Sequence, residues 1–206
     1  MYSCIPQFIL GFHGCDRKFG ESALQSTKTI LKKSENTYDW LGSGIYLWEN
    51  NPERALDYAK ELAEKPLKNR PEINNPFILG TVIDLGKCFN LLNAKYIEYL
   101  KLGYKFYTES VRRANTKLPT NKNAKGNNDK LIRHLDCAVI DFTLNYFEEE
   151  YNIHFDTVRG LFKEGTDIYP DAGFQEKNHI QVSVRNPNCI KGYFRILDQD
   201  SNYHIP

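Results

Sequence analysis

The stretch GSGIYLWENNPERALDYA, residues 42–59, constrains the fold more than any other part of the chain. Two glycines lead into an apolar, aromatic run that is typical of a strand at about 44–48. Asn51 and Pro52 then suit the N-cap and the first turn of a helix. One apolar helix face follows, made of Ala55, Leu56, Ala59, Leu62 and Ala63. We therefore expect a glycine turn, a strand and an amphipathic helix in direct succession.

The rest of the chain alternates between strand and helix patterns. Strands are expected at 8–14, 77–86, 157–162, 178–184 and 190–196, and helices at 21–33, at 94–114 with a break near Gly103, and at 129–150. Polar stretches at about 114–129 and at 163–177 lack periodicity and are predicted to be exposed loops. Helices concentrate in the first two thirds and strands at the end, which favours an α+β fold in a single domain spanning 1–206.

Composition and charge exclude some classes of protein. The formal net charge is +1, so the overall field does not require a polyanionic partner. The five cysteines are widely spaced, without a zinc-binding pattern, and are expected to be reduced and mostly buried. The first apolar run is shorter than the roughly 20 residues that a membrane span needs, which predicts a cytoplasmic protein without a membrane span.

Three separated segments carry residue types suited to holding a nucleotide. They are FHG at 12–14, GIYLWENNPERALDYA at 44–59, and NHIQVSVRNPNCIKGYF at 178–194. Taken in order, they resemble the three signature regions of the ADP-ribosyltransferase superfamily, in its His-Tyr-Glu branch of diphtheria toxin and the poly(ADP-ribose) polymerases. The chain also resembles small, uncharacterised bacterial and phage domains of that superfamily. The resemblance implies a split β core of two packed, mainly antiparallel sheets with surrounding helices.

The resemblance assigns cofactor-binding roles to the first two segments. His13 would hydrogen-bond a ribose hydroxyl of NAD, and the backbone of Gly14 would hold the nicotinamide amide. Gly44 opens the second segment, in which Tyr46 and Tyr58 would stack on the two faces of the nicotinamide. The family often has a serine three residues before the second tyrosine, whereas this chain has Ala55. Ordinary packing is the competing interpretation for His13 and for both tyrosines.

The third segment departs from the family pattern. Its register puts Gln181 at the position of the catalytic glutamate, so the chain would be a His-Tyr-Gln variant without that negative charge. Glu176 or Glu164, in the preceding loop, could supply the missing carboxylate, although both also fit solvated loop charges. His179 lies on the same face of its strand as Gln181 and would contact the acceptor or a phosphate.

The function implied by the resemblance is transfer of ADP-ribose from NAD to an unknown acceptor, which would be a protein, a nucleic acid or a small molecule, or water, as in an NAD glycohydrolase. Gln181, Glu176 and Tyr46 would form the catalytic group. A toxin, an effector or a phage-conflict protein with a neutralising partner would fit such a domain. The alternative is a catalytically impaired module of the same fold that binds NAD, ADP-ribose or a protein. A third alternative is an NAD-dependent removal of a 2′-phosphate from RNA.

Overall fold

The computed structural model describes residues 8–66, 71–123, 130–198 and 201–202. The elements in chain order are β1 (Phe8–Asp16), α1 (Arg17–Gln25), β2 (Ile45–Glu49), α2 (Pro52–Glu64), β3 (Pro76–Asp84), β4 (Cys88–Asn90), α3 (Ala94–Arg113), α4 (His134–Tyr151), β5 (Thr157–Phe162), β6 (His179–Val184), the 3₁₀ turn η1 (Pro187–Cys189) and β7 (Ile190–Phe194). The expected mixture of helices and strands in an α+β fold is confirmed.

The seven strands form one hydrogen-bonded sheet in the order β4-β5-β6-β2-β1-β3-β7. Neighbouring strands are antiparallel except β4 and β5, which are parallel. The outermost strands are short, with three residues in β4 and five in β7, and a register shift at Val82/Ile83 interrupts the ladder beside β7. The two packed sheets expected from the sequence are therefore replaced by one continuous mixed sheet.

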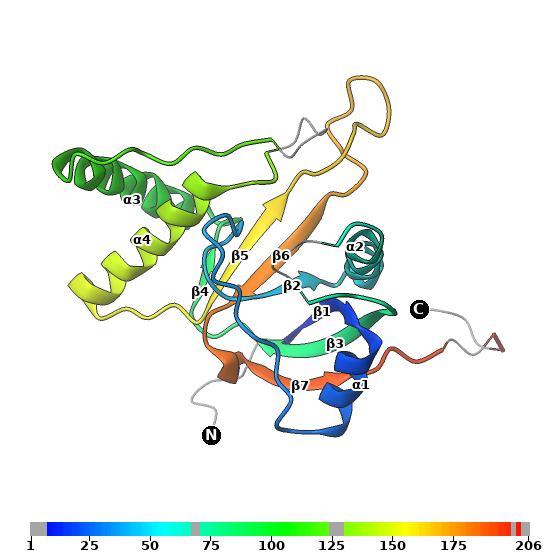
Figure 1. The fold of residues 1–206 in the computed structure, drawn as a ribbon. Helices are drawn as coiled ribbons and strands as arrows, with labels where there is room; N and C mark the ends of the chain where they lie inside the picture. The colour runs from blue at the N-terminus through cyan, green and yellow to red at the C-terminus, as the bar shows by residue number, and fades with distance from the viewer. Residues whose placement is uncertain (1–7, 67–70, 124–129, 199–200, 203–206) are drawn as a thin grey trace.

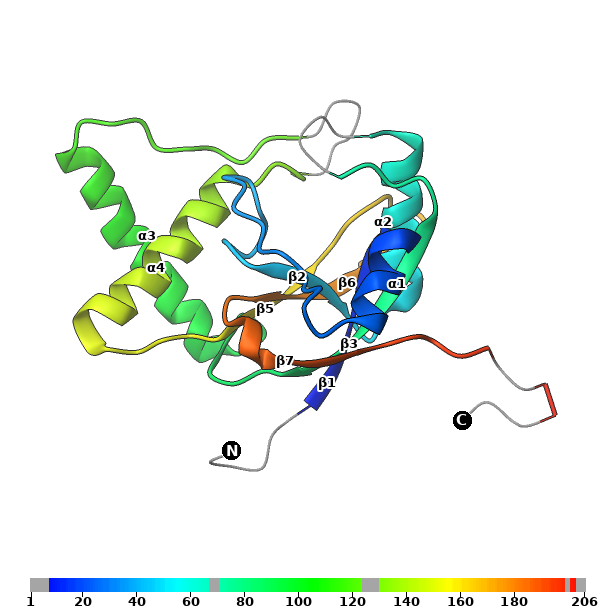
Figure 2. The ribbon, with the colours of Figure 1, turned by 60° about the horizontal axis from the view of Figure 1, so that its bottom comes forward.

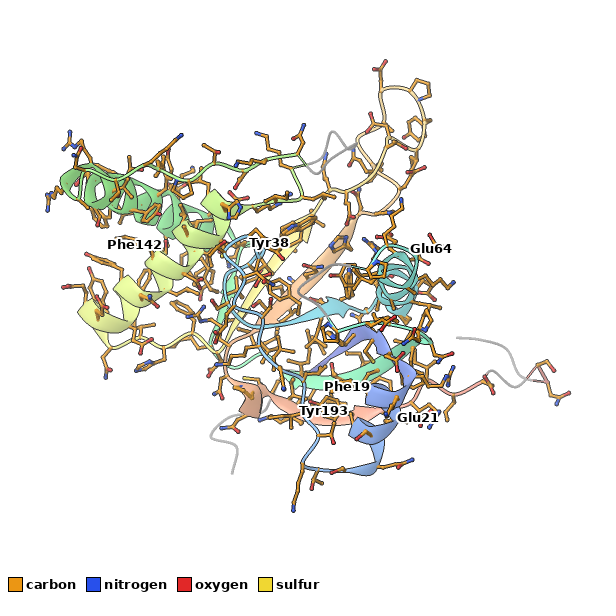
Figure 3. The ribbon with its side chains drawn as sticks, in the orientation of Figure 1. Phe19, Glu21, Tyr38, Glu64, Phe142 and Tyr193 are labelled. Carbon is orange, nitrogen blue, oxygen red and sulfur yellow. The ribbon has the colours of Figure 1, made fainter. Side chains whose placement is uncertain are left out.

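Helices cover both faces of this sheet, as Figures 1 and 2 show. The α1 face carries Ile45, Leu47, Val182 and Val184, which pack with Ala23 of α1 in one apolar cluster. The opposite face, called here the α2 face, is covered by α2 over β1 and β3 and by the α3–α4 pair over β4 and β5. Figure 3 adds the side chains, with Phe19 of α1 near Tyr193 of β7. The centre of the α2 face lies between the two groups of helices.

The register between β1 and β2 is the shortest strand pairing in the sheet. Only Gly11 with Glu49 and Phe12 with Trp48 are paired there. Beyond that point a side-chain hydrogen bond replaces the backbone pairing, because Nδ1 of His13 lies 3.0 Å from the carbonyl oxygen of Tyr46. The sheet is thus split locally at β1 and β2, where the sequence places two of the predicted site segments.

The helices predicted at 21–33 and at 94–114 differ from those observed. The helix expected at 21–33 is α1, which begins at Arg17 because the Asp16 side chain caps it and ends at Gln25, before the Ser26 side chain accepts a hydrogen bond from the amide of Lys28. The break expected near Gly103 is absent, since α3 runs unbroken. A Cβ at Gly103 would lie 1.9 Å from Thr143 Oγ1 of α4, so this glycine allows the two helices to approach closely.

The loop predicted at about 114–129 is partly described. Residues 114–123 contain no helix or strand beyond the single bridge of Lys122 to Ile132, and 124–129 lie outside the described residues. The helix expected at 129–150 begins later, at His134. Asn121 from the loop caps it, because its side-chain oxygen accepts hydrogen bonds from the amides of Leu135 and Asp136. The loop therefore fixes the start of α4.

Candidate functional site

His13 and Gly14 lie at the split between β1 and β2. A carbonyl oxygen only accepts, so Nδ1 of His13 donates to Tyr46 and carries the ring hydrogen. A Cβ on Gly14 would lie 2.1 Å from the carbonyl oxygen of Ala55, which allows α2 to lie directly against β1. The hydrogen bond of His13 and the close approach at Gly14 hold the first two segments together.

The side chain of Tyr46 in β2 lies on the α2 face of the sheet. Its hydroxyl donates to the Gly42 carbonyl at 2.6 Å and accepts from the Leu41 amide at 2.7 Å. Burial, with a smaller effect of Asp39, raises the pKa of Tyr46 far above its ordinary value. Gly44 lets the chain pass close to β6, because a Cβ there would lie 2.2 Å from Ser183 Oγ. The phenol is thus neutral and anchored to the glycine turn.

Trp48 is a central residue of the site that the sequence reasoning missed. It lies two positions after Tyr46, on the same face of β2, and is 4% exposed. Its ring packs on that of Tyr58 from α2, with centroids 4.9 Å apart. Its indole Nε1 is buried and has no hydrogen-bond partner in the part of the chain that the structure describes. Strand alternation after Tyr46 was the signal that could have found this residue.

Gln181 lies directly beside Trp48, because the two are paired in the register of β2 and β6. It is 9% exposed, and it shares the α2 face with His179. Glu176 lies elsewhere, since it is exposed and its carboxylate accepts a hydrogen bond from the Thr166 amide at 3.3 Å. The structure thus brings Gln181, Trp48 and His179 together and leaves Glu176 in the loop.

His179 is enclosed by aromatic rings. Trp40, Trp48 and Phe162 have ring centroids 5.9, 6.3 and 5.8 Å from that of His179. Its Nδ1 lies 2.6 Å from the Lys177 carbonyl, whereas its Nε2 is buried and finds no hydrogen-bond partner in the described ranges. Burial lowers the pKa of His179 below its ordinary value, with the Lys177 hydrogen bond opposing that effect. The side chain is a neutral imidazole at neutral pH.

A buried ion pair lies against this histidine. Arg54 of α2 donates through Nη2 to both carboxylate oxygens of Glu164, at 3.0 and 3.1 Å. Glu164 Oε2 is 3.8 Å from His179 Nδ1. The Arg54 guanidinium also lies 5.7 Å from the Trp48 ring centroid. Glu164 is therefore a buried carboxylate fixed in the site rather than a solvated loop charge.

Several polar atoms in this small region lack partners. Within the described residues they are Nε1 of Trp48, Nε2 of His179 and Nε of Arg54, whereas Nη1 of Arg54 lies 3.5 Å from Glu61 Oε1. Buried polar groups are nearly always hydrogen-bonded, so unpartnered groups gathered together indicate a site for a polar molecule. Trp48 and Arg54 offer donors, and neutral His179 offers an acceptor. This arrangement fits a ligand that bears both hydroxyl groups and acceptor oxygens.

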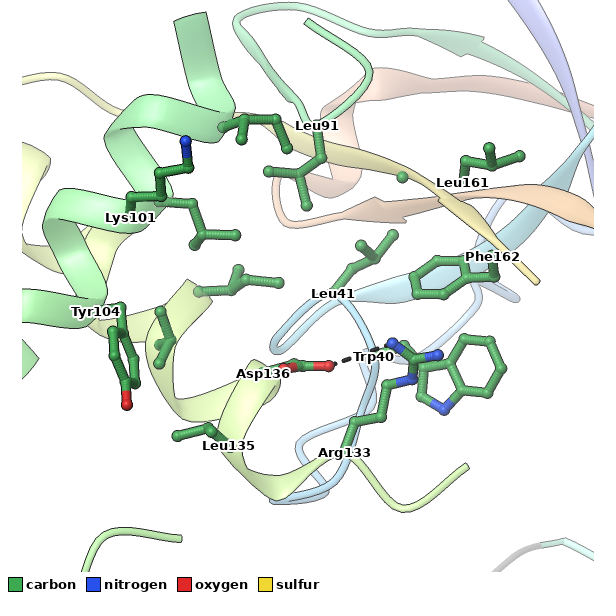
Figure 4. Close-up of a pocket in the computed structure, with 15 residues that line it drawn as sticks. Trp40, Leu41, Leu91, Lys101, Tyr104, Arg133, Leu135, Asp136, Leu161 and Phe162 are labelled. Carbon is green, nitrogen blue, oxygen red and sulfur yellow. Dashed lines mark hydrogen bonds and ion pairs between the residues drawn. The ribbon is translucent and has the colours of Figure 1, made fainter. Parts of the chain in front are cut away.

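A cavity of about 520 Å³ adjoins the histidine, between α3, α4 and β5. Figure 4 shows Trp40, Phe162 and Arg133 together at one end of it. Most of the other lining side chains are leucine, isoleucine and valine. The Arg133 guanidinium stacks on Trp40 at 4.4 Å and on Phe162 at 5.1 Å. The two rings that contact His179 thus form one end of the cavity.

Cysteine and metal chemistry find no support in the described part of the chain. Burial raises the pKa of Cys15 and Cys137 to about 12, so these thiols are poor nucleophiles. Cys4 lies outside the described residues. The described residues contain no group of three or more His, Cys, Asp or Glu side chains able to hold a metal ion. None of the described helices has the length and apolar character needed to cross a membrane.

Comparison with family models, with curated proteins and with solved structures gives no match for this chain.

Proposed function

We propose that this protein is an NAD-dependent ADP-ribosyltransferase-like enzyme that cleaves the bond between nicotinamide and ribose. One observation carries the proposal: three segments far apart in the sequence meet at the split in the sheet. His13 bonds to the backbone of Tyr46, Tyr58 packs on Trp48, and Trp48 is paired with Gln181. Their order and residue types agree with the sequence resemblance.

The proposed reaction needs a held leaving group and a stabilised ribose. Aromatic rings of Tyr46 and Tyr58 would bind the nicotinamide by stacking, and the Gly14 backbone would accept or donate to its amide. The Gln181 amide would hydrogen-bond the ribose hydroxyls as positive charge develops at the anomeric carbon. The buried Glu164 carboxylate would add negative potential, which favours that charge.

Trp48 sets a condition on this mechanism. Its ring now packs against Tyr58, where a stacked nicotinamide would otherwise contact that tyrosine. Binding of NAD therefore requires a rotation of Trp48. We expect its fluorescence to change when NAD binds, which gives a direct signal for the proposed site.

The test combines NAD binding by calorimetry with nicotinamide release followed by chromatography. Wild type is compared with Tyr58→Ala and with Tyr169→Ala, a control at an exposed loop position. Loss of one stacking ring is expected to cost about 0.5–1.5 kcal/mol, which weakens NAD binding about 2- to 10-fold. The control should bind like wild type. Absence of nicotinamide release by wild type, with and without a cell extract as acceptor, would contradict the proposal.

A binding module is the second candidate, favoured by the uncharged Gln181 at the position where the family has its glutamate. Such a module would bind NAD or ADP-ribose without turnover. Gln181→Glu separates the two functions. If nicotinamide release appears only in that variant, the chain is a binding module, and if wild type already turns over, it is an enzyme.

A further inference from the structure

One ring nitrogen of His179 makes a hydrogen bond, and the other is available to a ligand. Nδ1 lies 2.6 Å from the carbonyl oxygen of Lys177, which only accepts, so Nδ1 carries the hydrogen. In the neutral ring Nε2 therefore has a free lone pair. This atom is buried and has no hydrogen-bond partner among the described residues, and the residue is only 4% exposed. A fixed tautomer with an unpartnered, basic nitrogen is the arrangement that a general base requires.

Charged groups from three elements surround this imidazole. Glu164, after β5, lies 3.8 Å from Nδ1 and favours the protonated ring. Arg54 of α2 and Arg133, which precedes α4, disfavour it. Lys177 contributes its carbonyl. A proton taken up by Nε2 would thus be stabilised by Glu164, while the two arginines and burial keep the resting ring neutral.

The apolar cavity lies beyond two of the rings that surround His179. Trp40 and Phe162 contact His179 on one side and line the cavity on the other. Trp40 is held by a hydrogen bond from its Nε1 to the Leu131 carbonyl and by the stacked Arg133. Rotation of the Trp40 ring would join the cavity to the histidine. An acceptor that enters this way must have a mainly apolar body.

We propose that His179 is the general base of the site and that the acceptor is a hydroxyl group carried on an apolar molecule. This inference rests on the proposed function. In the reaction the C–N bond between ribose and nicotinamide breaks, and its electron pair leaves with neutral nicotinamide. A lone pair of the acceptor oxygen forms the new C–O bond to the anomeric carbon. The hydroxyl proton passes to Nε2 of His179 and from there to solvent.

The test measures nicotinamide release from NAD with benzyl alcohol as the acceptor and methanol at equal concentration as the small comparison. His179→Asn is the informative variant, because its side-chain amide can keep the hydrogen bond to the Lys177 carbonyl while the acceptor at Nε2 is lost. His154→Asn, at an exposed histidine, is the matched control. Calorimetry of NAD binding and thermal melting are run on each protein.

Four results are expected. Wild type forms the benzyl glycoside of ADP-ribose in excess over the methyl glycoside. His179→Asn lowers the rate about 100-fold or more while NAD affinity stays within about threefold. The kcat/KM of wild type falls about tenfold per pH unit once Nε2 is protonated, below the ordinary His range, and this limb is missing in the variant. His154→Asn behaves as wild type.

The contrary results separate the two proposals. If wild type releases no nicotinamide, the proposed function fails and the assignment of the base fails with it. If wild type is active and His179→Asn retains its rate and its pH profile, only the base is overturned. If the methyl glycoside or the hydrolysis product exceeds the benzyl glycoside, the apolar acceptor is overturned. Should His179→Asn not fold, His179→Gln, whose amide lies near the position of Nε2, is tested in the same way.

Discussion

Strand β6 shows two different environments within six residues. On the α1 face, Val182 and Val184 are fully buried in an apolar cluster. On the α2 face, His179, Gln181 and Ser183 are buried as well, yet Nε2 of His179 has no hydrogen-bond partner in the part of the chain that the structure describes. One face of the strand therefore stabilises the fold, whereas the other holds polar groups at a cost in stability.

This difference indicates where selection for function acts. An unpartnered buried polar group costs about 1–3 kcal/mol, and an apolar residue of similar shape would avoid that cost. A chain that keeps several such groups side by side, with a buried ion pair next to them, has a use for them other than stability. The three predictions below test this contrast, in order of decreasing effect.

The buried ion pair should give the largest effect. Arg54→Met leaves Glu164 buried without its partner, and breaking such a pair costs about 3–5 kcal/mol. Urea denaturation should show a much lower midpoint. The double variant Arg54→Met/Glu164→Leu should recover most of the loss, because it removes both charges. Arg195→Met, which breaks the exposed pair with Glu21, is the control and should leave the midpoint nearly unchanged. Equal midpoints for Arg54→Met and Arg195→Met would contradict the expected difference between the buried and the exposed ion pair.

Loss of packing on the α1 face comes next. Leu47 is fully buried, and Leu47→Ala should lower the free energy of unfolding by about 2–5 kcal/mol. Gln181→Leu, on the other face of the same sheet, should leave stability unchanged or raise it, since it replaces a polar group by an apolar one. Both are measured by urea denaturation. A large loss for Gln181→Leu would show that the α2 face is as tightly optimised as the α1 face.

The smallest expected effect is the pH dependence of stability that His179 causes. Its folded pKa lies below its ordinary value of 6.5, so the unfolded chain binds more protons as pH falls below that value. The stability contributed by the neutral ring is present above pH 6.5 and is lost as pH falls toward the folded pKa. This group gives a slope of at most about 1.4 kcal/mol per pH unit. Denaturation between pH 7.5 and 5 should show the slope in wild type and in His154→Asn, and a shallower one in His179→Asn. Equal slopes in all three would contradict the prediction.

Local patterns predicted much of the fold. The strand and helix in residues 44–64 agree with β2 and α2, because Asn51 and Pro52 mark the boundary clearly. Gly103 was misread as a break because a glycine suggests local flexibility, whereas the contact with Thr143 that explains it comes from a helix 40 positions away in sequence. The single sheet was missed because pairing between distant strands leaves no local signal.

The candidate site was predicted only in part. Gln181 was predicted from the register of the resemblance and His179 from strand alternation, but the role of Trp48 depends on its register with β6 and on its contact with Tyr58. For Glu164 the sequence left open a site carboxylate and a solvated loop charge, since its partner Arg54 is 110 positions away in the chain. Pairs of this kind are determined by tertiary structure, which a single sequence does not reveal.

The short outer strands affect how the molecule meets other copies of itself. An exposed strand edge is a template for pairing with a second chain and for fibril growth. Here β4 offers three residues, and the ladder next to β7 is interrupted at Val82/Ile83. Lys191 adds a positive charge on β7 itself. The sheet therefore ends in edges that are poor templates, and we expect the native protein to resist fibrillar aggregation even though its interior is rich in β structure.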